Sequence, residues 1–259
     1  MMSEYLVSAR KYRPNKFENV VGQDHVTQTL ANAILKNQIA HSYLFCGPRG
    51  VGKTTCARIF AALVNGDNDS DNAYNIFELD AASNNSVDDI RNLIDQVQIP
   101  PQTGKYKIYI IDEVHMLSSS AFNAFLKTLE EPPRHSIFIL ATTEKKKIIP
   151  TILSRCQIFD FNKISANKIN KYLKQIVEKE EIKVGNDSIK LIAEKADGSL
   201  RDALSIFDKV YTFCNKEWVY QEVSKILLSL DSGFSIKITN YIISKDIPSC
   251  LLQINEVLN

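Results

Sequence analysis

The sequence of 259 residues predicts an α/β fold, a parallel sheet flanked by helices, followed by a small all-helical domain. Short β-branched or aromatic runs alternate with amphipathic stretches as far as residue 162, which is typical of parallel strands joined by helices. Beyond that point, apolar residues recur only at helical spacing. We therefore expect an α/β core in 1–162, a helical domain in 163–229 and the start of another helical region in 230–259.

Each expected element rests on its apolar period and on the polar residues that bound it. Asp24 and Ser86 are suited to begin helices, and Pro132 to end one. The strands expected in the first domain are 43–46, 76–79, 107–111, 137–141 and 157–161. The helices expected are 24–36, 54–64, 86–97 and 119–130, then 165–181, 187–196, 199–213 and 217–228, with one or two more in 232–259.

Charge and cysteine usage limit the functional classes. Lys and Arg total 31 and Asp and Glu total 30, so net charge gives no signature of a nucleic-acid-binding protein. Any DNA contact must come from a local patch or from several subunits together. The run 145–147 (KKK) is a candidate for phosphate contact, although a solvated turn explains it better.

The five cysteines include no C-x-x-C pair, so neither a zinc site nor a disulfide scaffold is expected. The first 17 residues contain no apolar segment typical of a secretory signal. No apolar run approaches the length of about 20 residues that crosses a bilayer. These patterns predict a cytoplasmic protein without a membrane partner.

A phosphate-binding loop follows the first expected strand. Its glycines allow backbone N–H groups to surround phosphate oxygens, and the next helix directs its positive end at them. The lysine would reach the β- and γ-phosphates and the next hydroxyl would bind Mg²⁺. The alternative is a chance glycine turn. The residues expected to bind ATP here are Gly47, Pro48, Arg49, Gly50, Val51, Gly52, Lys53, Thr54 and Thr55.

Two carboxylates, Asp112 and Glu113, end the third expected strand. A carboxylate at this edge can hold Mg²⁺ directly or through water, and the next can orient and deprotonate an attacking water. Alone, the pair would also fit an exposed acidic turn. Together with the phosphate-binding loop, it predicts a magnesium site made by Thr54 and Asp112 beside a general base, Glu113.

Three further residues could act on the phosphates of ATP. Thr143 follows the fourth strand, where a hydroxyl could sense the γ-phosphate, although a polar strand end is equally consistent. Arg155 is either a surface ion-pair partner or a cation that stabilises a transferring phosphoryl group, in trans across a subunit interface. Arg201 begins a helix, an unfavourable place for a cation unless it contacts phosphate. A solvated arginine remains its alternative.

Many segments, in order along the chain, resemble AAA+ clamp-loader ATPases, and in particular the gamma/tau family of bacterial DNA polymerase III subunits. The resemblance covers about residues 5–230. The segments that carry it are 10–14 (RKYRP), Phe17, 20–23 (VVGQ), 41–45 (HSYLF), 79–83 (LDAAS), 111–117 (IDEVHML), 122–133 (FNAFLKTLEEPP), 140–143 (LATT), 152–156 (ILSRC) and 198–204 (GSLRDAL).

The resemblance implies an ATPase domain, a helical lid and a helical collar that joins five subunits. Such an assembly opens a sliding clamp and places it on primed DNA during chromosomal replication, as part of a holoenzyme with DNA-directed DNA polymerase activity. By family role, Lys53 and Thr54 hold phosphate and Mg²⁺, Asp112 and Glu113 serve Mg²⁺ and water, Thr143 resembles sensor 1, Arg201 sensor 2, and Arg155 the arginine finger. The segment that embraces adenine in such proteins contains Arg10, Tyr12, Val20 and Val21.

Two departures from the family pattern matter. The family usually carries a four-cysteine zinc module after the phosphate-loop helix, and the short polar segment Asn65 to Asn75 replaces it here. We therefore expect no zinc. The chain ends at Asn259, so we expect most of the collar to be missing from it and pentamer formation by this chain alone to be impaired.

Two other functions deserve comparison. A non-hydrolysing scaffold subunit of the same loader can keep the Ser154-Arg155-Cys156 triplet, but it can lack the working phosphate loop that is intact here. A different AAA+ motor, such as a branch-migration helicase, would share the loop. The Ser-Arg-Cys triplet and the segment 129–133 (LEEPP) favour the clamp loader over such a motor.

Overall fold

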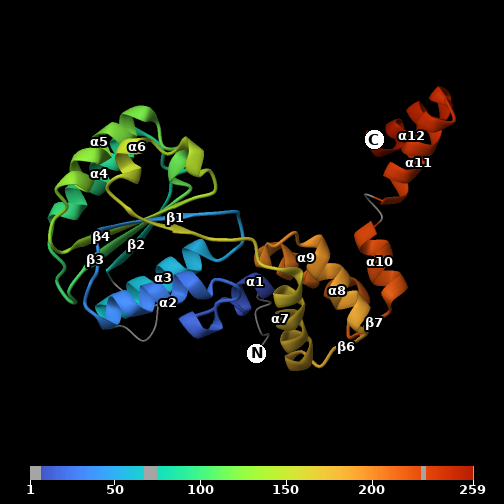
Figure 1. Ribbon diagram of the computed structural model, residues 1–259, viewed down its shortest axis with the longest axis horizontal. Coiled ribbons are helices and arrows are strands. Elements are labelled where there is room, and N and C mark those ends of the chain that lie inside the picture. The colour runs from blue at the N-terminus through green and yellow to red at the C-terminus, as the bar shows by residue number, and fades with distance from the viewer. Residues whose placement is uncertain (1–6, 67–74, 229–231, 259) are drawn as a thin grey trace, which may run out of the picture.

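A computed structural model describes residues 7–66, 75–228 and 232–258. Its first part contains one parallel sheet of five strands in the order β2-β3-β4-β1-β5. Figure 1 shows the sheet enclosed by helices. The five strands that the sequence predicts are thus confirmed. Their bounds are β1 Ser42–Cys46, β2 Ile76–Asp80, β3 Lys107–Asp112, β4 Ser136–Thr142 and β5 Gln157–Asp160.

Alternate residues of each strand point to opposite faces of the sheet, and each face has its own apolar core. On β1, Tyr43 and Phe45 pack toward α2 and α3, whereas Leu44 packs toward the other face. The helices of the two faces lie on opposite sides of the sheet in Figure 1. Their bounds are α2 Asp24–Leu35 and α3 Lys53–Asn65 on one face, and α4 Val87–Gln98, α5 Ser119–Glu130 and α6 Pro150–Leu153 on the other.

Local sequence fixes several of these helix boundaries. The Ser86 side chain accepts the Asp89 N–H at the start of α4, while the Asp89 carboxylate accepts the Ser86 N–H, a capping box. Ser118 caps α5 in the same way through Ala121. Two short 3₁₀ turns, η2 Val114–Met116 and η3 Lys145–Lys147, follow β3 and β4.

The second part is helical, as predicted, with its own core around Ile169, Phe207 and Trp218. Its helices are α7 Ala166–Lys179, α8 Asn186–Lys195, α9 Leu200–Cys214 and α10 Tyr220–Leu228. One addition was not predicted: β6 Lys183–Val184 pairs with β7 Glu217–Trp218. Strands of two residues are too short to show an apolar period, which is why the sequence did not indicate them. Because β7 takes up Glu217–Trp218, the helix predicted for 217–228 begins only at Tyr220.

The first helix, α1 Ser8–Lys11, packs on the helical second part, α7 to α10, called the lid from here on, rather than on the sheet. The Ser8 N–H donates to the Asp208 carboxylate at 2.8 Å, and the Tyr172 hydroxyl donates to the Tyr12 carbonyl at 2.9 Å. The chain then returns to the first core through η1 Phe17–Asn19. After Phe161 the chain passes from the core back to the helical part. The two passages lie side by side, since the side chain of the fully buried Gln23 forms hydrogen bonds with the N–H and C=O of Asn162.

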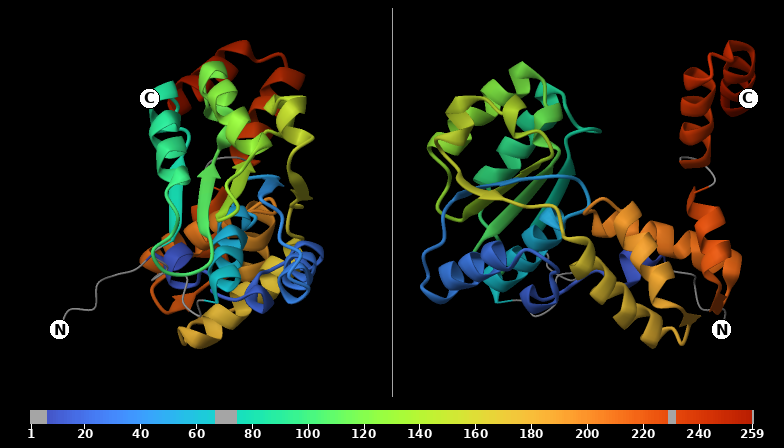
Figure 2. Two further views of the ribbon diagram at one scale, coloured as in Figure 1. Left: turned by 90° about the vertical axis from the view of Figure 1, so that its left-hand side faces the viewer. Right: turned by 45° about the vertical axis from the view of Figure 1, so that its right-hand side comes forward.

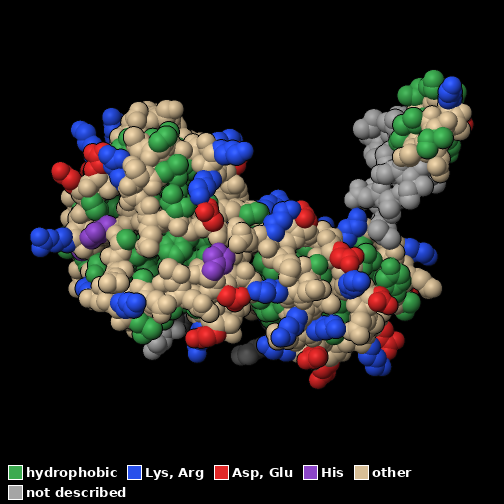
Figure 3. Space-filling model, in the orientation of Figure 1, with side chains coloured by type: hydrophobic (Ala, Val, Ile, Leu, Met, Phe, Trp, Pro, Cys, Tyr) green, Lys and Arg blue, Asp and Glu red, His purple; other side chains and the backbone are tan. Residues whose placement is uncertain are grey.

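The last two helices, α11 Ser232–Ile243 and α12 Ile247–Leu258, pack on each other and project away from the rest of the molecule (Figures 1 and 2). Several of their apolar side chains, among them Ile243 and Leu252, are exposed. On the face shown in Figure 3, acidic and basic side chains are interspersed over both the core and the lid. Within the described ranges, no helix is long and apolar enough to cross a membrane.

Candidate nucleotide site

A cavity of about 580 Å³ lies where the carboxyl edge of the sheet meets the lid. It is bordered by the N-terminal segment, the phosphate-binding loop with the start of α3, the ends of β2 and β3, Ile164, and the start of α9. The structure thus brings most of the predicted site residues together. Those lining the cavity are Tyr12, Val20, Val21, Arg49, Gly50, Val51, Gly52, Lys53, Thr54, Thr55, Asp112, Glu113 and Arg201.

The phosphate-binding loop takes a backbone path that favours glycine. Gly50 and Gly52 have φ of 72° and 102°, in the left-handed region, and Gly52 immediately precedes α3. The Gly50 carbonyl accepts the N–H groups of Leu200 and Arg201 at 3.0 and 3.3 Å. A Cβ at Gly50 would lie 2.0 Å from the Ser199 hydroxyl oxygen. The lid therefore contacts the loop through main-chain atoms, and only glycine fits between them.

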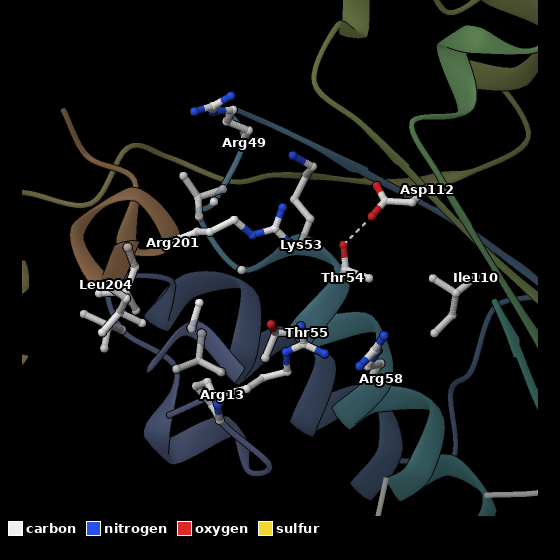
Figure 4. A pocket seen from close by; sticks show the side chains of 18 of the residues that line it. Arg13, Arg49, Lys53, Thr54, Thr55, Arg58, Ile110, Asp112, Arg201 and Leu204 are labelled. Atoms are coloured by element: carbon white, nitrogen blue, oxygen red, sulfur yellow. Dashed lines mark hydrogen bonds between the residues drawn. The ribbon is translucent and has the colours of Figure 1, made fainter. Parts of the chain in front are cut away.

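Lys53 lies with 5% of its surface exposed, and its ammonium donates to the carbonyls of Gly47 and Pro48, both at 2.8 Å. Burial lowers the pKa of Lys53, and the nearby carboxylates of Glu113 and Asp112 oppose this shift. Figure 4 shows Arg201 reaching toward Lys53 across the loop. Two cations that face one pocket repel each other, so a polyanion such as a triphosphate is favoured between them.

Thr54 and Asp112 meet at the predicted magnesium site. The Thr54 hydroxyl donates to one carboxylate oxygen of Asp112 at 2.6 Å (Figure 4), and the other oxygen accepts the Glu113 N–H at 2.9 Å. A hydroxyl and a carboxylate are hard oxygen ligands of the kind that Mg²⁺ takes, with water and phosphate completing its octahedron. These residues therefore fit the metal that ATP brings with it.

Glu113 is held by the residue expected to sense phosphate. One of its carboxylate oxygens accepts both the N–H of Thr143 at 3.1 Å and its hydroxyl at 2.9 Å. Glu113 itself has φ of 47°, which is strained for a residue with a side chain. Thr143 thus lies behind Glu113 and is not among the residues that border the cavity.

His115 is a neighbour of this pair that the sequence reasoning missed. Its buried ring places Nδ1 2.9 Å from the Thr142 hydroxyl and 3.4 Å from the Glu113 carboxylate. It therefore links the end of β3 to the end of β4. The sequence did hold a signal for it: His115 is two residues after Glu113 in the segment that follows the same strand, so it had to lie close to that carboxylate.

The predicted adenine segment is divided by the structure. Tyr12, Val20 and Val21 border the cavity, whereas Arg10 is exposed and lies outside its lining, so its role stays a prediction. The Tyr12 hydroxyl donates to Glu180, and burial, followed by this bond, raises the pKa of Tyr12 to about 12. Arg13, which was not predicted, also borders the cavity (Figure 4). The Arg-Pro pair in the segment 10–14 could have indicated it.

Arg155 lies at the other edge of the sheet. It comes just before β5, whose first residue, Gln157, pairs with Tyr43 near the amino end of β1. The phosphate loop begins at Gly47, beyond the carboxyl end of β1, which is about 13 Å from Tyr43 at 3.3 Å per residue. Arg155 is accordingly not among the residues that line the cavity, and its role stays a prediction. The segment 67–74, where a zinc module would stand, lies outside the described residues, and the absence of zinc stays a prediction.

The strand order, the phosphate loop after β1, an interior strand, and the lid over the cavity define an AAA+ nucleotide-binding protein. Solved structures agree with this fold. A point variant of Thermotoga maritima RuvB superposes with a TM-score of 0.68 over 90% of this chain and 79% of that chain, at 20% identity. The structure titled Thermotoga maritima RuvB Holliday junction branch migration motor gives the same TM-score, coverage and identity.

Sequence relatives are more specific. The family described as DNA polymerase III, delta subunit, matches residues 22–165, and the DNA polymerase III clamp loader subunit, ATPase lid domain, matches 168–216. DNA polymerase III subunit tau of Bacillus subtilis is 44% identical over 98% of this chain and 48% of its own length. DNA polymerase III subunit gamma of Buchnera aphidicola (Acyrthosiphon pisum) is 37% identical over 98% of this chain and 74% of its own length.

The chain therefore belongs to the gamma/tau family of DNA polymerase III clamp-loader subunits. It spans about half the length of the tau relative from Bacillus subtilis, and 42% of the tau subunit from Escherichia coli, to which it is 41% identical. The resemblance inferred from the sequence segments is confirmed.

Proposed function

We propose that this chain is an ATP-binding and ATP-hydrolysing subunit of the DNA polymerase III clamp loader, which places the sliding clamp on primed DNA during chromosomal replication. The observation that supports this most is the convergence of Lys53, Thr54, Asp112, Glu113 and Arg201 on one cavity between the sheet and the lid. The match to a clamp loader subunit supports the sliding clamp as a partner, and we extend the proposal to primed DNA.

The residues of the cavity have distinct tasks in the proposed reaction. The loop amides and Lys53 hold the β- and γ-phosphates, and Thr54 and Asp112 hold Mg²⁺, which neutralises phosphate charge when bound. Glu113 orients water and accepts its proton as the water attacks the γ-phosphorus. Thr143 keeps the Glu113 carboxylate at the end of β4, close to where that water would lie.

Arg201 connects chemistry to movement. It begins α9, whose first N–H groups already bind the carbonyl of Gly50 in the phosphate loop. A γ-phosphate between Lys53 and Arg201 adds a second link between core and lid, and its loss after hydrolysis removes that link. The lid angle, and with it the geometry of the assembly, would therefore follow the nucleotide state.

Arg155 completes the site of a neighbouring subunit, because it faces away from its own nucleotide. In a ring of five subunits, as the family implies, each such contact places one subunit's arginine on the next subunit's ATP. Within the holoenzyme, the chain would serve DNA-directed DNA polymerase by supplying the clamp, while the polymerase chemistry belongs to a different subunit. We place this work in the bacterial cytoplasm.

The deciding test is ATP hydrolysis by the full-length protein, alone and with its partner subunits, the clamp and primed DNA. We expect turnover to appear on assembly, to rise with clamp and DNA, and to vanish in Lys53→Ala. A protein that binds ATP but is never stimulated by any partner would be a non-hydrolysing scaffold, and the proposal would be wrong.

A further inference from the structure

Arg155 is fixed in one orientation by its own chain. Its Nη1 donates to the Thr151 carbonyl at 2.7 Å and to the Ser154 hydroxyl at 3.1 Å, and its Nη2 donates to the Glu130 carboxylate at 2.5 Å. The side chain remains 32% exposed, so one edge of the guanidinium faces solvent. The arginine is thus ordered and still accessible.

Glu130 occupies an unusual place for an acidic residue. It is the last residue of α5, where the helix dipole is negative and a carboxylate is disfavoured. Its pairing with Arg155 offsets this cost. The next residue, Glu131, is also an exposed acid, but no ion pair to it occurs among the described residues. Two adjacent carboxylates therefore differ in one respect, the contact with Arg155.

The three contacts leave Arg155 with further donors. A guanidinium carries more N–H groups than these contacts use, so donors remain for the oxygens of a phosphate. An open hollow lined by His41, Ser42 and Pro132 adjoins Arg155 and Glu130, so nothing in the described part of the chain covers this edge. A phosphate on a neighbouring subunit can approach there without displacing Glu130.

We propose that Glu130 is a positioning residue for Arg155. It orders the guanidinium before the neighbour's phosphate arrives, so that less side-chain freedom is lost when the two meet. This inference rests on the proposed function, because Arg155 acts only beside a neighbour's ATP. The opposite assignment is a latch, in which Glu130 competes with phosphate for Arg155 and restrains hydrolysis. The two assignments predict effects of opposite sign.

The test is the DNA- and clamp-stimulated ATPase of the full assembly carrying Glu130→Ala, Glu130→Gln, Arg155→Ala or both. Because a misplaced catalytic group costs up to about 100-fold, we expect Glu130→Ala to lower kcat roughly 10- to 100-fold. The KM for ATP should change little, because a group that acts mainly in the transition state alters kcat rather than ground-state binding. Glu130→Gln keeps a hydrogen-bond acceptor and should restore most of the rate. In the Arg155→Ala background, Glu130→Ala should have no further effect.

Glu131→Ala is the matched control, and we expect it to keep the wild-type rate. Because the Arg155–Glu130 pair is partly exposed, its loss should leave the melting temperature nearly unchanged. A faster Glu130→Ala enzyme would establish the latch and overturn the inference, as would an additional loss in the Arg155→Ala background. If wild type is stimulated by DNA and Arg155→Ala is not, an unaltered Glu130→Ala rate refutes only this inference. If wild type itself is never stimulated, the proposed function fails and the inference fails with it.

Discussion

The carboxyl and amino edges of the sheet differ in the residues that they bring together. At the carboxyl edge, the loop after β1 and the ends of β2 and β3 converge on one cavity, which the start of α9 in the lid also borders. At the amino edge, a single arginine is held by one carboxylate beside an open hollow. Under the proposed function, one chain therefore contains a nearly complete site and, separately, a part for another site. The following predictions test that division, beginning with the largest expected effect.

Arg155→Ala should separate binding from hydrolysis. ATP affinity should stay at the wild-type level, because Arg155 lies at the edge opposite the cavity, while DNA-stimulated turnover of the assembly should fall on the order of 10³-fold or more. Equilibrium ATP titration and steady-state ATPase assays measure the two quantities. Arg134→Ala removes an exposed arginine just before β4 at the same edge and should change neither. Full turnover by Arg155→Ala would show that the amino edge has no part in catalysis.

Glu113→Gln tests the carboxyl edge in the same way. The amide cannot accept the proton of the attacking water, so turnover should fall by about 10²- to 10⁴-fold while ATP still binds. Glu144→Gln, which alters an exposed carboxylate 3.5 Å from the His115 ring, should keep most of the activity. A Glu113→Gln protein with normal hydrolysis would remove the general base from the proposed site.

Gly50→Ala tests the contact between loop and lid. The added Cβ would lie 2.0 Å from the Ser199 hydroxyl oxygen, and φ of +72° is strained for alanine, so the lid must shift. We expect ATP affinity to fall about 10-fold, as for the loss of roughly 1.4 kcal/mol. Gly66→Ala shares a positive φ of +77° but meets nothing within 4 Å. It should lower the melting temperature without altering ATP affinity, and equal effects on ATP binding would refute the contact.

Tyr12→Phe should have the smallest effect, a loss of about 2- to 10-fold in ATP affinity, because one hydrogen bond between the N-terminal segment and the lid disappears. Hydrogen bonds from Lys11, then from Tyr12, hold the pKa of Glu180 below its usual range. The stability that the ionised Glu180 contributes is therefore complete above the usual pKa of a glutamate and is lost as pH falls through the lowered pKa. The pKa of Tyr12 is raised to about 12, so its contribution is complete below pH 10 and is lost toward pH 12.

ATP affinity measured against pH should therefore differ between wild type and Tyr12→Phe only between the lowered pKa of Glu180 and the raised pKa of Tyr12, about 12. Tyr220→Phe, at an exposed tyrosine of α10, is the control and should match wild type throughout. A difference between wild type and Tyr12→Phe that persisted unchanged in acid would mean that Glu180 does not hold this segment.

Sequence alone predicted the order and type of the main elements, because apolar periods and turn residues act locally. It also predicted Lys53, Thr54, Asp112 and Glu113, since each follows a strand in a recognisable motif. It missed His115, Gln23 and the contact of Gly50 with the lid. Their partners are distant along the chain, and a main-chain hydrogen bond leaves no trace in residue type. The pairing of Glu130 with Arg155 was hidden for the same reason, since 25 positions separate them.

The two neighbouring crossings between core and lid have a mechanical consequence. A single tether would let the lid swivel freely, but here the chain passes from lid to core before Gln23 and back after Asn162, and these two residues bind each other. The lid is therefore attached to the core at two neighbouring points, an arrangement that permits a hinge motion but resists twisting. A movement of the lid that is driven at the nucleotide would therefore follow one direction.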